Sequence, residues 1–192
     1  MANVNRPKGF SVSRTMSGSP ISGTLRQYPV DAANAVAINP GDAVKLEDDG
    51  NVAAITSDSD TLLGVCTGVV VDRAVPNTEH PGYLPALTAG NILIGVGTDL
   101  VYTIQEDSVG GSMVAANVGA TGNVAIGVGD TTTAGSGHLL DSSSVIANDG
   151  TPAVGQLVVL GLVNAPDNEL GTNAKWEVRI NKSAFALGQS GI

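Results

Sequence analysis

Acidic residues are missing from one end of this chain. Residues 1–26 carry four basic side chains and neither Asp nor Glu. Residues 27–174 carry seventeen acidic side chains against two basic ones, a net charge of −15, and residues 175–192 return to +2. The whole chain of 192 residues therefore has a net charge of −9. The acidic middle argues against direct binding to nucleic acid, and the basic N-terminal segment is predicted to contact another molecule.

The residue types that most often carry chemistry are also scarce. There is one cysteine, Cys66, and there are two histidines, His80 and His138. A single cysteine excludes an intramolecular disulfide and is typical of folding in a reducing compartment. Its apolar neighbours predict a buried, unreactive thiol.

Two histidines and one cysteine are too few for a zinc site or for a His-activated nucleophile at a recognisable motif. We therefore predict no catalytic residues, no metal site, no cofactor and no enzymatic activity. A hard cation bound by carboxylates such as Asp58 and Asp60 remains an alternative to solvated turns.

Aromatic residues make up only 3% of the chain, so Val, Ile, Leu and Ala must build the core. No apolar run approaches the roughly 20 residues of a membrane span, and the N-terminus lacks the apolar region of a signal peptide. No membrane partner is expected.

Short β-strands separated by turns dominate what is present. The clearest strand is predicted over residues 175–182, where Trp176, Val178 and Ile180 share one face. A hairpin is predicted around residues 48–51 (DDGN). No stretch of twelve residues keeps a helical period. The sequence predicts an all-β fold, an antiparallel sandwich or barrel with long loops, whose body spans residues 27–192. Two β units, at about 27–106 and 107–192, are expected within that body.

Residues 1–26, the basic arm, have proline and glycine at spacings that interrupt any periodicity. We expect an irregular, extended N-terminal arm, either docked through scattered apolar residues or disordered. The residues predicted to contact another molecule are Arg6, Lys8, Phe10, Arg14 and Arg26. A second basic surface is expected around Arg179.

Several segments, in order along the chain, resemble pieces of tailed-bacteriophage head proteins. They are residues 5–10 (NRPKGF), 41–46 (GDAVKL), 63–65 (LGV), 79–86 (EHPGYLPA), 104–111 (IQEDSVGG), 136–138 (SGH), 140–143 (LDSS), 167–171 (DNELG) and 173–181 (NAKWEVRIN). The family that these segments resemble is the capsid cement, or decoration, proteins.

The resemblance implies a β-rich structural protein of the virion that binds the outer surface of the phage head and stabilises contacts between capsomers. Its implied partners are the major capsid protein and further copies of itself, as a dimer or trimer. The alternative is another β-rich virion component, such as a tail or receptor- and glycan-binding protein.

Overall fold

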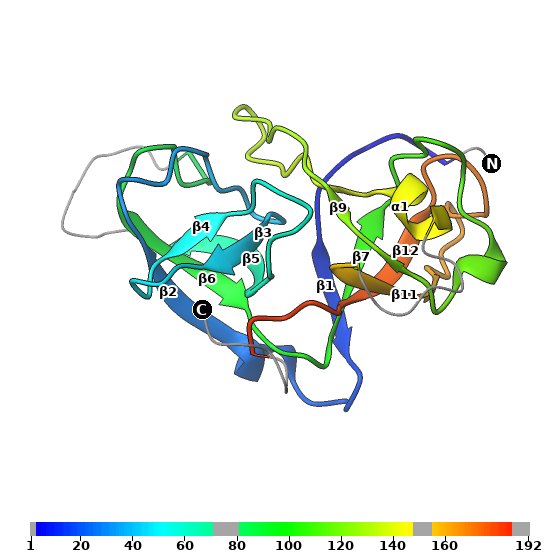
Figure 1. Cartoon of the computed structure of the whole chain (residues 1–192), viewed down its shortest axis with the longest axis horizontal. Helices are drawn as coiled ribbons and strands as arrows, with labels where there is room; N and C mark the ends of the chain where they lie inside the picture. Colours follow the sequence, from blue (N-terminus) through cyan, green and yellow to red (C-terminus); the bar gives the residue numbers. More distant parts are fainter. Residues whose placement is uncertain (1–2, 71–80, 148–154, 186–192) are drawn as a thin grey trace.

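The protein is all-β, as the sequence predicts. The computed structural model describes residues 3–70, 81–147 and 155–185. Two five-stranded antiparallel sheets pack together in a sandwich, and a two-stranded sheet lies beside them (Figure 1). Neither large sheet closes into a barrel within the described ranges. The sandwich alternative is therefore the one that the structure confirms.

The middle sheet is formed by residues 25–95. Its strands, in spatial order, are β2 (Leu25–Val30), β6 (Gly90–Gly95), β5 (Gly64–Val70), β3 (Ala43–Leu46) and β4 (Val52–Ala54). Strands β3 and β4 form the predicted hairpin, with Lys45 opposite Ala53. Gly50 in its turn has a φ of +85°, a conformation that glycine adopts without a steric penalty.

The terminal sheet takes its strands from both ends of the chain. Its order is β1 (Ser11–Thr15), β7 (Leu100–Gln105), β12 (Lys175–Ile180), β11 (Leu157–Leu162) and β8 (Thr121–Gly122). The predicted alternation in β12 is confirmed, because Trp176, Val178 and Ile180 are all buried. Strand β12 lies at the centre of this sheet, between β7 and β11.

Five short elements complete the described fold. They are η1 (Ile21–Thr24), η2 (Ala115–Asn117), β9 (Val124–Ala125), β10 (Leu139–Leu140) and α1 (Ser142–Ala147). Strands β9 and β10 pair with each other. The residues between them form a loop that stands out from the sheets in Figure 1, at the top of the view.

The two sheets do not follow the boundary at residue 106 that the sequence suggests. The chain begins in the terminal sheet, builds the middle sheet from residues 25–95, and returns to the terminal sheet at β7. Strand β7, assigned from the sequence to the first β unit, pairs with β12 near the C-terminus. Local patterns identify strands, whereas long-range pairing decides the sheet that each strand joins.

Two hydrophobic clusters fill the interior. One lies within the middle sheet and includes Ile92, Ile94 and Cys66. The larger cluster surrounds Trp176 and Tyr102, and it also takes in buried residues of the middle-sheet segment, among them Ala43, Ile55, Leu62 and Val65. The sheets therefore share buried apolar surface.

The basic arm is docked on the body, which is one of the two expected alternatives, but it is not irregular throughout. Strand β1 pairs antiparallel with β7, with Val12 opposite Tyr102. Residues 25 and 26 already belong to β2 of the middle sheet. Phe10 is only 4% exposed and belongs to the larger cluster. The arm is thus tied into both sheets, because pairing with β7 and burial of one aromatic ring stabilise a segment of weak intrinsic β pattern.

Candidate interaction groove

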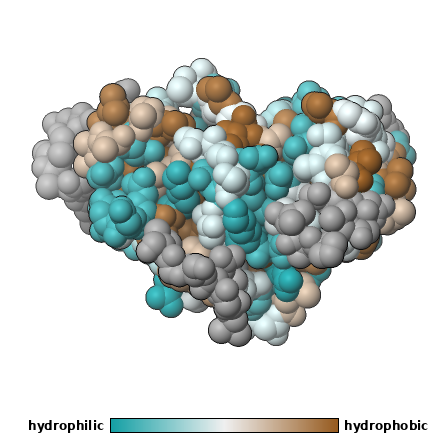
Figure 2. All heavy atoms as spheres, in the orientation of Figure 1, coloured by the Kyte–Doolittle hydropathy of each residue, from teal (hydrophilic) through white to brown (hydrophobic). Residues whose placement is uncertain are grey.

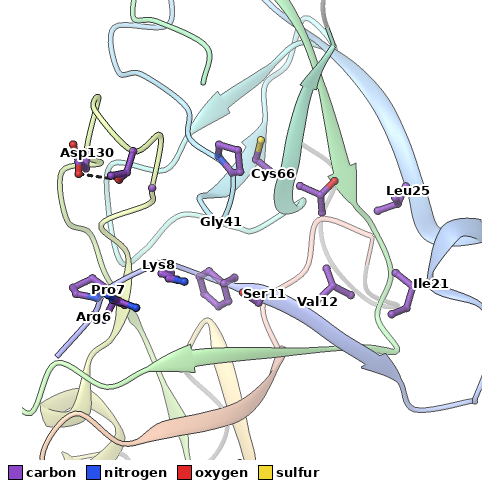
Figure 3. Close-up of a pocket in the computed structure, with 15 residues that line it drawn as sticks. Arg6, Pro7, Lys8, Ser11, Val12, Ile21, Leu25, Gly41, Cys66 and Asp130 are labelled. Atoms are coloured by element: carbon purple, nitrogen blue, oxygen red, sulfur yellow. Dashed lines mark hydrogen bonds between the residues drawn. The ribbon is translucent and has the colours of Figure 1, made fainter. Parts of the chain in front are cut away.

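An open groove lies between the two sheets, along the basic arm (Figure 3). Its volume is about 960 Å³. One side is formed by residues 6–12, from the arm into β1, with Ile21 and Leu25 beyond them. The opposite side is formed by Pro40 and Gly41 together with Cys66 and Thr67 of β5, and the loop between β9 and β10 contributes Asp130, Thr133 and Gly135.

The main chain of the arm is fixed where it borders the groove. The Phe10 amide donates to the Gly41 carbonyl at 2.9 Å, and the Gly41 amide donates to the Cys66 carbonyl at 2.7 Å. The Phe10 ring meets Tyr102 edge-on, with ring centroids 5.9 Å apart. The Arg6 amide donates to Gln105 Oε1 at 3.0 Å. These contacts set the direction in which the neighbouring side chains leave the backbone.

Gly9 makes this path possible. Its φ is +66°, and a Cβ built on it would lie 2.2 Å from Ser136 Oγ and 2.3 Å from the Gly41 carbonyl oxygen. Only a residue without a side chain fits there. The arm therefore passes directly between the middle sheet and the loop that carries Ser136.

Arg6 and Lys8, two of the predicted contact residues, are exposed and line this groove. Neither forms an ion pair with any residue in the described ranges. They also line a smaller neighbouring hollow of about 180 Å³, together with Gln105 and Lys175. The groove is consequently bordered by two cations that have no ion-pair partner among the described residues.

The other predicted contact residues lie elsewhere. Phe10 touches the groove from below but is buried in the core, so its ring supports the arm and is not presented to a partner. Arg14 is engaged by Glu177 of β12 at 2.8 Å, and this hydrogen bond raises the pKa of the guanidinium. Arg26 is exposed on β2 but does not line the groove. The structure thus brings together Arg6 and Lys8 and separates them from Arg14 and Arg26.

The second basic surface expected around Arg179 is only partly neutralised. Lys175 pairs with Asp167 at 3.3 Å, and Arg14 with Glu177 occupies the same sheet. Lys182 donates to the Ser59 carbonyl, which carries no charge. Arg179 is half-buried. Neither Arg179 nor Lys182 forms an ion pair with a residue in the described ranges.

The floor and far rim differ in character from the basic side. Val12, Ile21 and Leu25 supply apolar surface. Asp130 accepts hydrogen bonds from the Thr132 amide and the Thr133 hydroxyl, each at 2.8 Å, and these lower the pKa of its carboxyl. Asp130 therefore stays charged and shapes its own turn. The groove combines an apolar end with an end at which Arg6 and Lys8 lie across from Asp130 (Figure 3).

His138 and Asp42 form a buried polar pair behind the groove. The Ala43 amide donates to His138 Nδ1 at 3.1 Å, so this nitrogen is unprotonated and Nε2 carries the hydrogen. Nε2 lies 3.7 Å from Asp42 Oδ1. Because both ring nitrogens face protein groups, the imidazole fixes the loop after β9 against the start of β3, and it has no free nitrogen with which to activate a nucleophile.

Cys66 is buried, as predicted, and burial raises the pKa of its thiol to about 12. Its neighbours at the groove, Thr67 and Gly41, are neutral. A thiol of this kind is not a nucleophile near neutral pH. His80 and Arg73 fall outside the described residues.

The sequence revealed the basic side of the groove but not its opposite side. Loop residues 130–135 reach the groove because the backbones of Gly127 and Gly137 lie directly against each other at the base of the loop. A Cβ on Gly127 would lie 2.1 Å from the Gly137 carbonyl oxygen. The paired glycines at 127, 129, 135 and 137 are the sequence signal for this narrow loop.

Comparison with known proteins identifies no relative: no family model, curated protein or solved structure matches the chain. Within the described ranges, no three His, Cys, Asp or Glu side chains gather into a set that could hold a metal ion. The helices described here are all too short or too polar to cross a membrane.

Proposed function

We propose that this chain is a capsid cement protein of a tailed bacteriophage, bound to the outer surface of the head and stabilising the contacts between capsomers. The resemblance of ordered segments across most of the chain supports this proposal. The all-β sandwich agrees with it. In this view the protein folds in the host cytoplasm and ends in the virion.

The observation that carries the proposal is the pair of free cations beside the groove. Arg6 and Lys8 project from a main chain that is fixed on both sides, and they lie within the segment at residues 5–10 that resembles head proteins. Rigid presentation of unpaired charge is typical of a surface that recognises another protein.

The proposed partners come from the resemblance to head proteins, and the groove gives them a place to bind. The major capsid protein is the proposed partner of Arg6 and Lys8. Many weak contacts, repeated by the symmetry of a shell, would add up through multivalency. Further copies of the chain, in a dimer or trimer, would bring several grooves to the shell at once. Packaged DNA is not a proposed partner because the chain is strongly acidic outside the arm.

The remaining surface suits a contact built from small polar and apolar patches. On the face in Figure 2, hydrophilic and hydrophobic residues are interspersed, and the outline is indented between two halves. Val128, on the loop beside the groove, is 97% exposed. A protruding loop with an apolar side chain next to a charged groove gives a partner two kinds of contact.

The described side chains give no support to the enzyme alternative. His138 is held by the Ala43 amide and faces Asp42, and Cys66 is buried with a raised pKa. We propose a structural role without catalytic residues or cofactor.

The aromatic residues do not favour the glycan-binding alternative. Sugar-binding proteins use exposed aromatic rings as stacking surfaces. All six aromatic residues are described, and Phe10, Tyr102 and Trp176 are buried, while Phe185 alone among the six is more than half exposed. A tail or receptor-binding role is therefore the less favoured alternative.

Binding to empty phage heads assembled without this protein tests the proposal. The purified chain is expected to saturate such heads and to raise the temperature at which filled heads release DNA. Failure of the unmodified chain to bind heads would contradict the proposed function.

Two substitutions that change the net charge equally distinguish a specific contact at the groove from a general effect of charge on binding. Arg6→Glu should reduce occupancy about tenfold, by removing a contact and adding a repulsive one. Arg26→Glu, on β2 outside the groove, should leave occupancy within about twofold, because isolated surface charges contribute little. Equal losses for both variants would show that net charge, and not the groove, governs binding.

A further inference from the structure

We propose that the groove binds an extended acidic segment of the capsid protein, which adds as a strand to the open edge of β1. The identity of the partner rests on the proposed function. The mode of binding rests on the geometry of the groove, and it can be tested separately.

Strand β1 is the edge of the terminal sheet. It pairs with β7 on one side, and no described strand pairs with it on the other. Figure 3 shows β7 on one side of β1, while Gly41 and Cys66 lie across the groove on the other side. Backbone groups along an open strand edge are available to an added strand.

The register of β1 limits where an added strand can pair. A bulge lies between Val12 and Arg14, and after it the strand continues to Thr15. Bulges weaken edge-to-edge pairing and redirect the strand. An added strand would therefore pair with the part before the bulge, from Ser11 to Val12, which is also the part that lines the groove.

The dimensions allow a segment of several residues. A volume of about 960 Å³ lies near the upper end of the roughly 300–1,000 Å³ found for ligand pockets. The groove is also open, so an extended segment can enter along its length and does not need a free terminus.

The chemistry of the lining selects for a particular pattern in the occupant. Arg6 and Lys8 lie at one end of the groove, and Val12, Ile21 and Leu25 lie at the other end (Figure 3). A segment with acidic residues in one half and apolar residues in the other satisfies both. Asp130 on the far rim repels acidic side chains there and so helps to set the position of the segment.

A second copy of this chain is a poorer occupant. Two of its acidic residues in described turns are already engaged: Asp49 accepts from Asn51, and Asp60 accepts from Thr56, Ser57 and Lys45. Glu177 is paired with Arg14. Moving these carboxylates into another molecule's groove would break turns or sheet contacts that hold the donor copy together.

Selection from a displayed library of short random linear peptides tests this mode of binding with the full chain as bait. We expect enrichment of peptides that carry acidic residues in one half and apolar residues in the other. A selected peptide should bind the Arg6→Glu, Lys8→Glu double variant about tenfold more weakly, and it should bind Arg26→Glu as it binds the unmodified chain. Circular dichroism of each variant confirms that it is folded.

Hydrogen exchange with the selected peptide locates the site. Amides of β1 and of residues 66–67 should exchange more slowly in the complex. Selection of basic peptides, no enrichment at all, equal binding to the double variant, or protection confined to other strands would each overturn the proposal. Concentration-dependent self-association that the double variant abolishes would instead identify a second copy as the occupant and equally overturn it.

The outcomes remain distinct from those of the head-binding experiment. Heads that bind the unmodified chain but also bind the double variant normally would leave the cement role intact and remove the groove from it. In another outcome, peptide selection succeeds while the unmodified chain fails to bind heads. That result would establish the groove as an acidic-peptide site and exclude the capsid protein as its partner.

Discussion

At the scale of single residues, close backbone contacts decide how the groove is formed. Gly9 and Gly18 both lie in the basic arm and both have a positive φ, +66° and +77°. They differ in surroundings. A Cβ on Gly9 would collide with Ser136 and Gly41, while a Cβ on Gly18 would meet nothing within 4 Å.

This difference predicts unequal costs for the same substitution. Gly18→Ala should lower the free energy of unfolding by about 1–2 kcal/mol, the cost of a left-handed conformation. Gly9→Ala should cost about 2–5 kcal/mol, because overpacking adds to that strain. Urea denaturation of both variants measures the difference, and equal costs would mean that Ser136 does not lie against Gly9.

The buried imidazole gives a second residue-scale prediction. Burial lowers the pKa of His138, and the nearby Asp42 opposes this without reversing it. The folded state therefore binds a proton less readily than the unfolded state does, whose histidine titrates near pH 6.5. The contribution of His138 is fully present above about pH 6.5 and is lost as the pH falls below it.

We expect the free energy of unfolding to decrease between about pH 7 and pH 5, and the decrease to be smaller in His138→Asn. The Asn carbonyl oxygen can accept the Ala43 hydrogen bond but does not titrate. His80→Asn is the matched control, since His80 is the only other histidine. If His80→Asn flattens the pH profile and His138→Asn does not, the assignment to His138 is wrong.

At the scale of elements, β1 shows how pairing creates a strand from an unpromising sequence. Its five residues, SVSRT, contain one apolar side chain. Its stability comes from β7 on one side and from the preceding Phe10, which is buried against Tyr102. The basic arm is therefore a structural part of the sandwich as well as the carrier of the two free cations.

Phe10→Ala should lower the free energy of unfolding by about 3–5 kcal/mol, the usual cost of removing a buried aromatic ring. Arg6→Ala, five residues before strand β1 but exposed, should change it by no more than about 0.5 kcal/mol. Thermal or chemical denaturation gives both values. If Phe10→Ala were as stable as the unmodified protein, the arm would not be a structural part of the core.

Strands with a strong local pattern could be predicted, and strands defined by their partners could not. Strands β3 and β4 form the hairpin predicted around residues 48–51, and β12 coincides with the alternating segment predicted over residues 175–182. Strand β1 was missed because its pattern is polar. Helix α1 was missed because six residues are too few to show a helical period.

Some residues of the groove could likewise be predicted from the sequence, and others could not. Charge alone pointed to Arg6 and Lys8, and both line the groove. Charge could not show that Arg14 would be paired with Glu177, since these residues are 163 positions apart in the chain. Nor could it show that Cys66 and the loop at residues 130–135 would form the opposite side, because that depends on how the two sheets pack.

At the scale of the whole molecule, polar contacts join the sheets at several places within the described residues. On one side, Phe10 bonds to Gly41 and the Ala43 amide bonds to His138. On another, the Leu62 amide donates to the Lys182 carbonyl at 2.9 Å and the Ala184 amide donates to the Leu62 carbonyl at 2.8 Å. Together with the shared hydrophobic cluster, these contacts make separate unfolding of the two sheets costly.

We therefore expect a single cooperative unfolding transition. Trp176 fluorescence reports on the terminal sheet, because Trp176 is the only tryptophan and lies in β12. Far-ultraviolet circular dichroism reports on both sheets. The two signals should give coincident curves in urea, whereas two separate midpoints would show that the middle sheet unfolds on its own.

The central claim is that this two-sheet protein lies on the outside of a phage head with its basic groove against the shell. A density map of intact virions tests it most directly. The account predicts β-rich density that fits the sandwich over capsomer junctions, with Arg6 and Lys8 facing an acidic extended segment of the capsid protein. Density that fits the sandwich only in the tail, or on the outside of the head with the groove turned away from the shell, would contradict it.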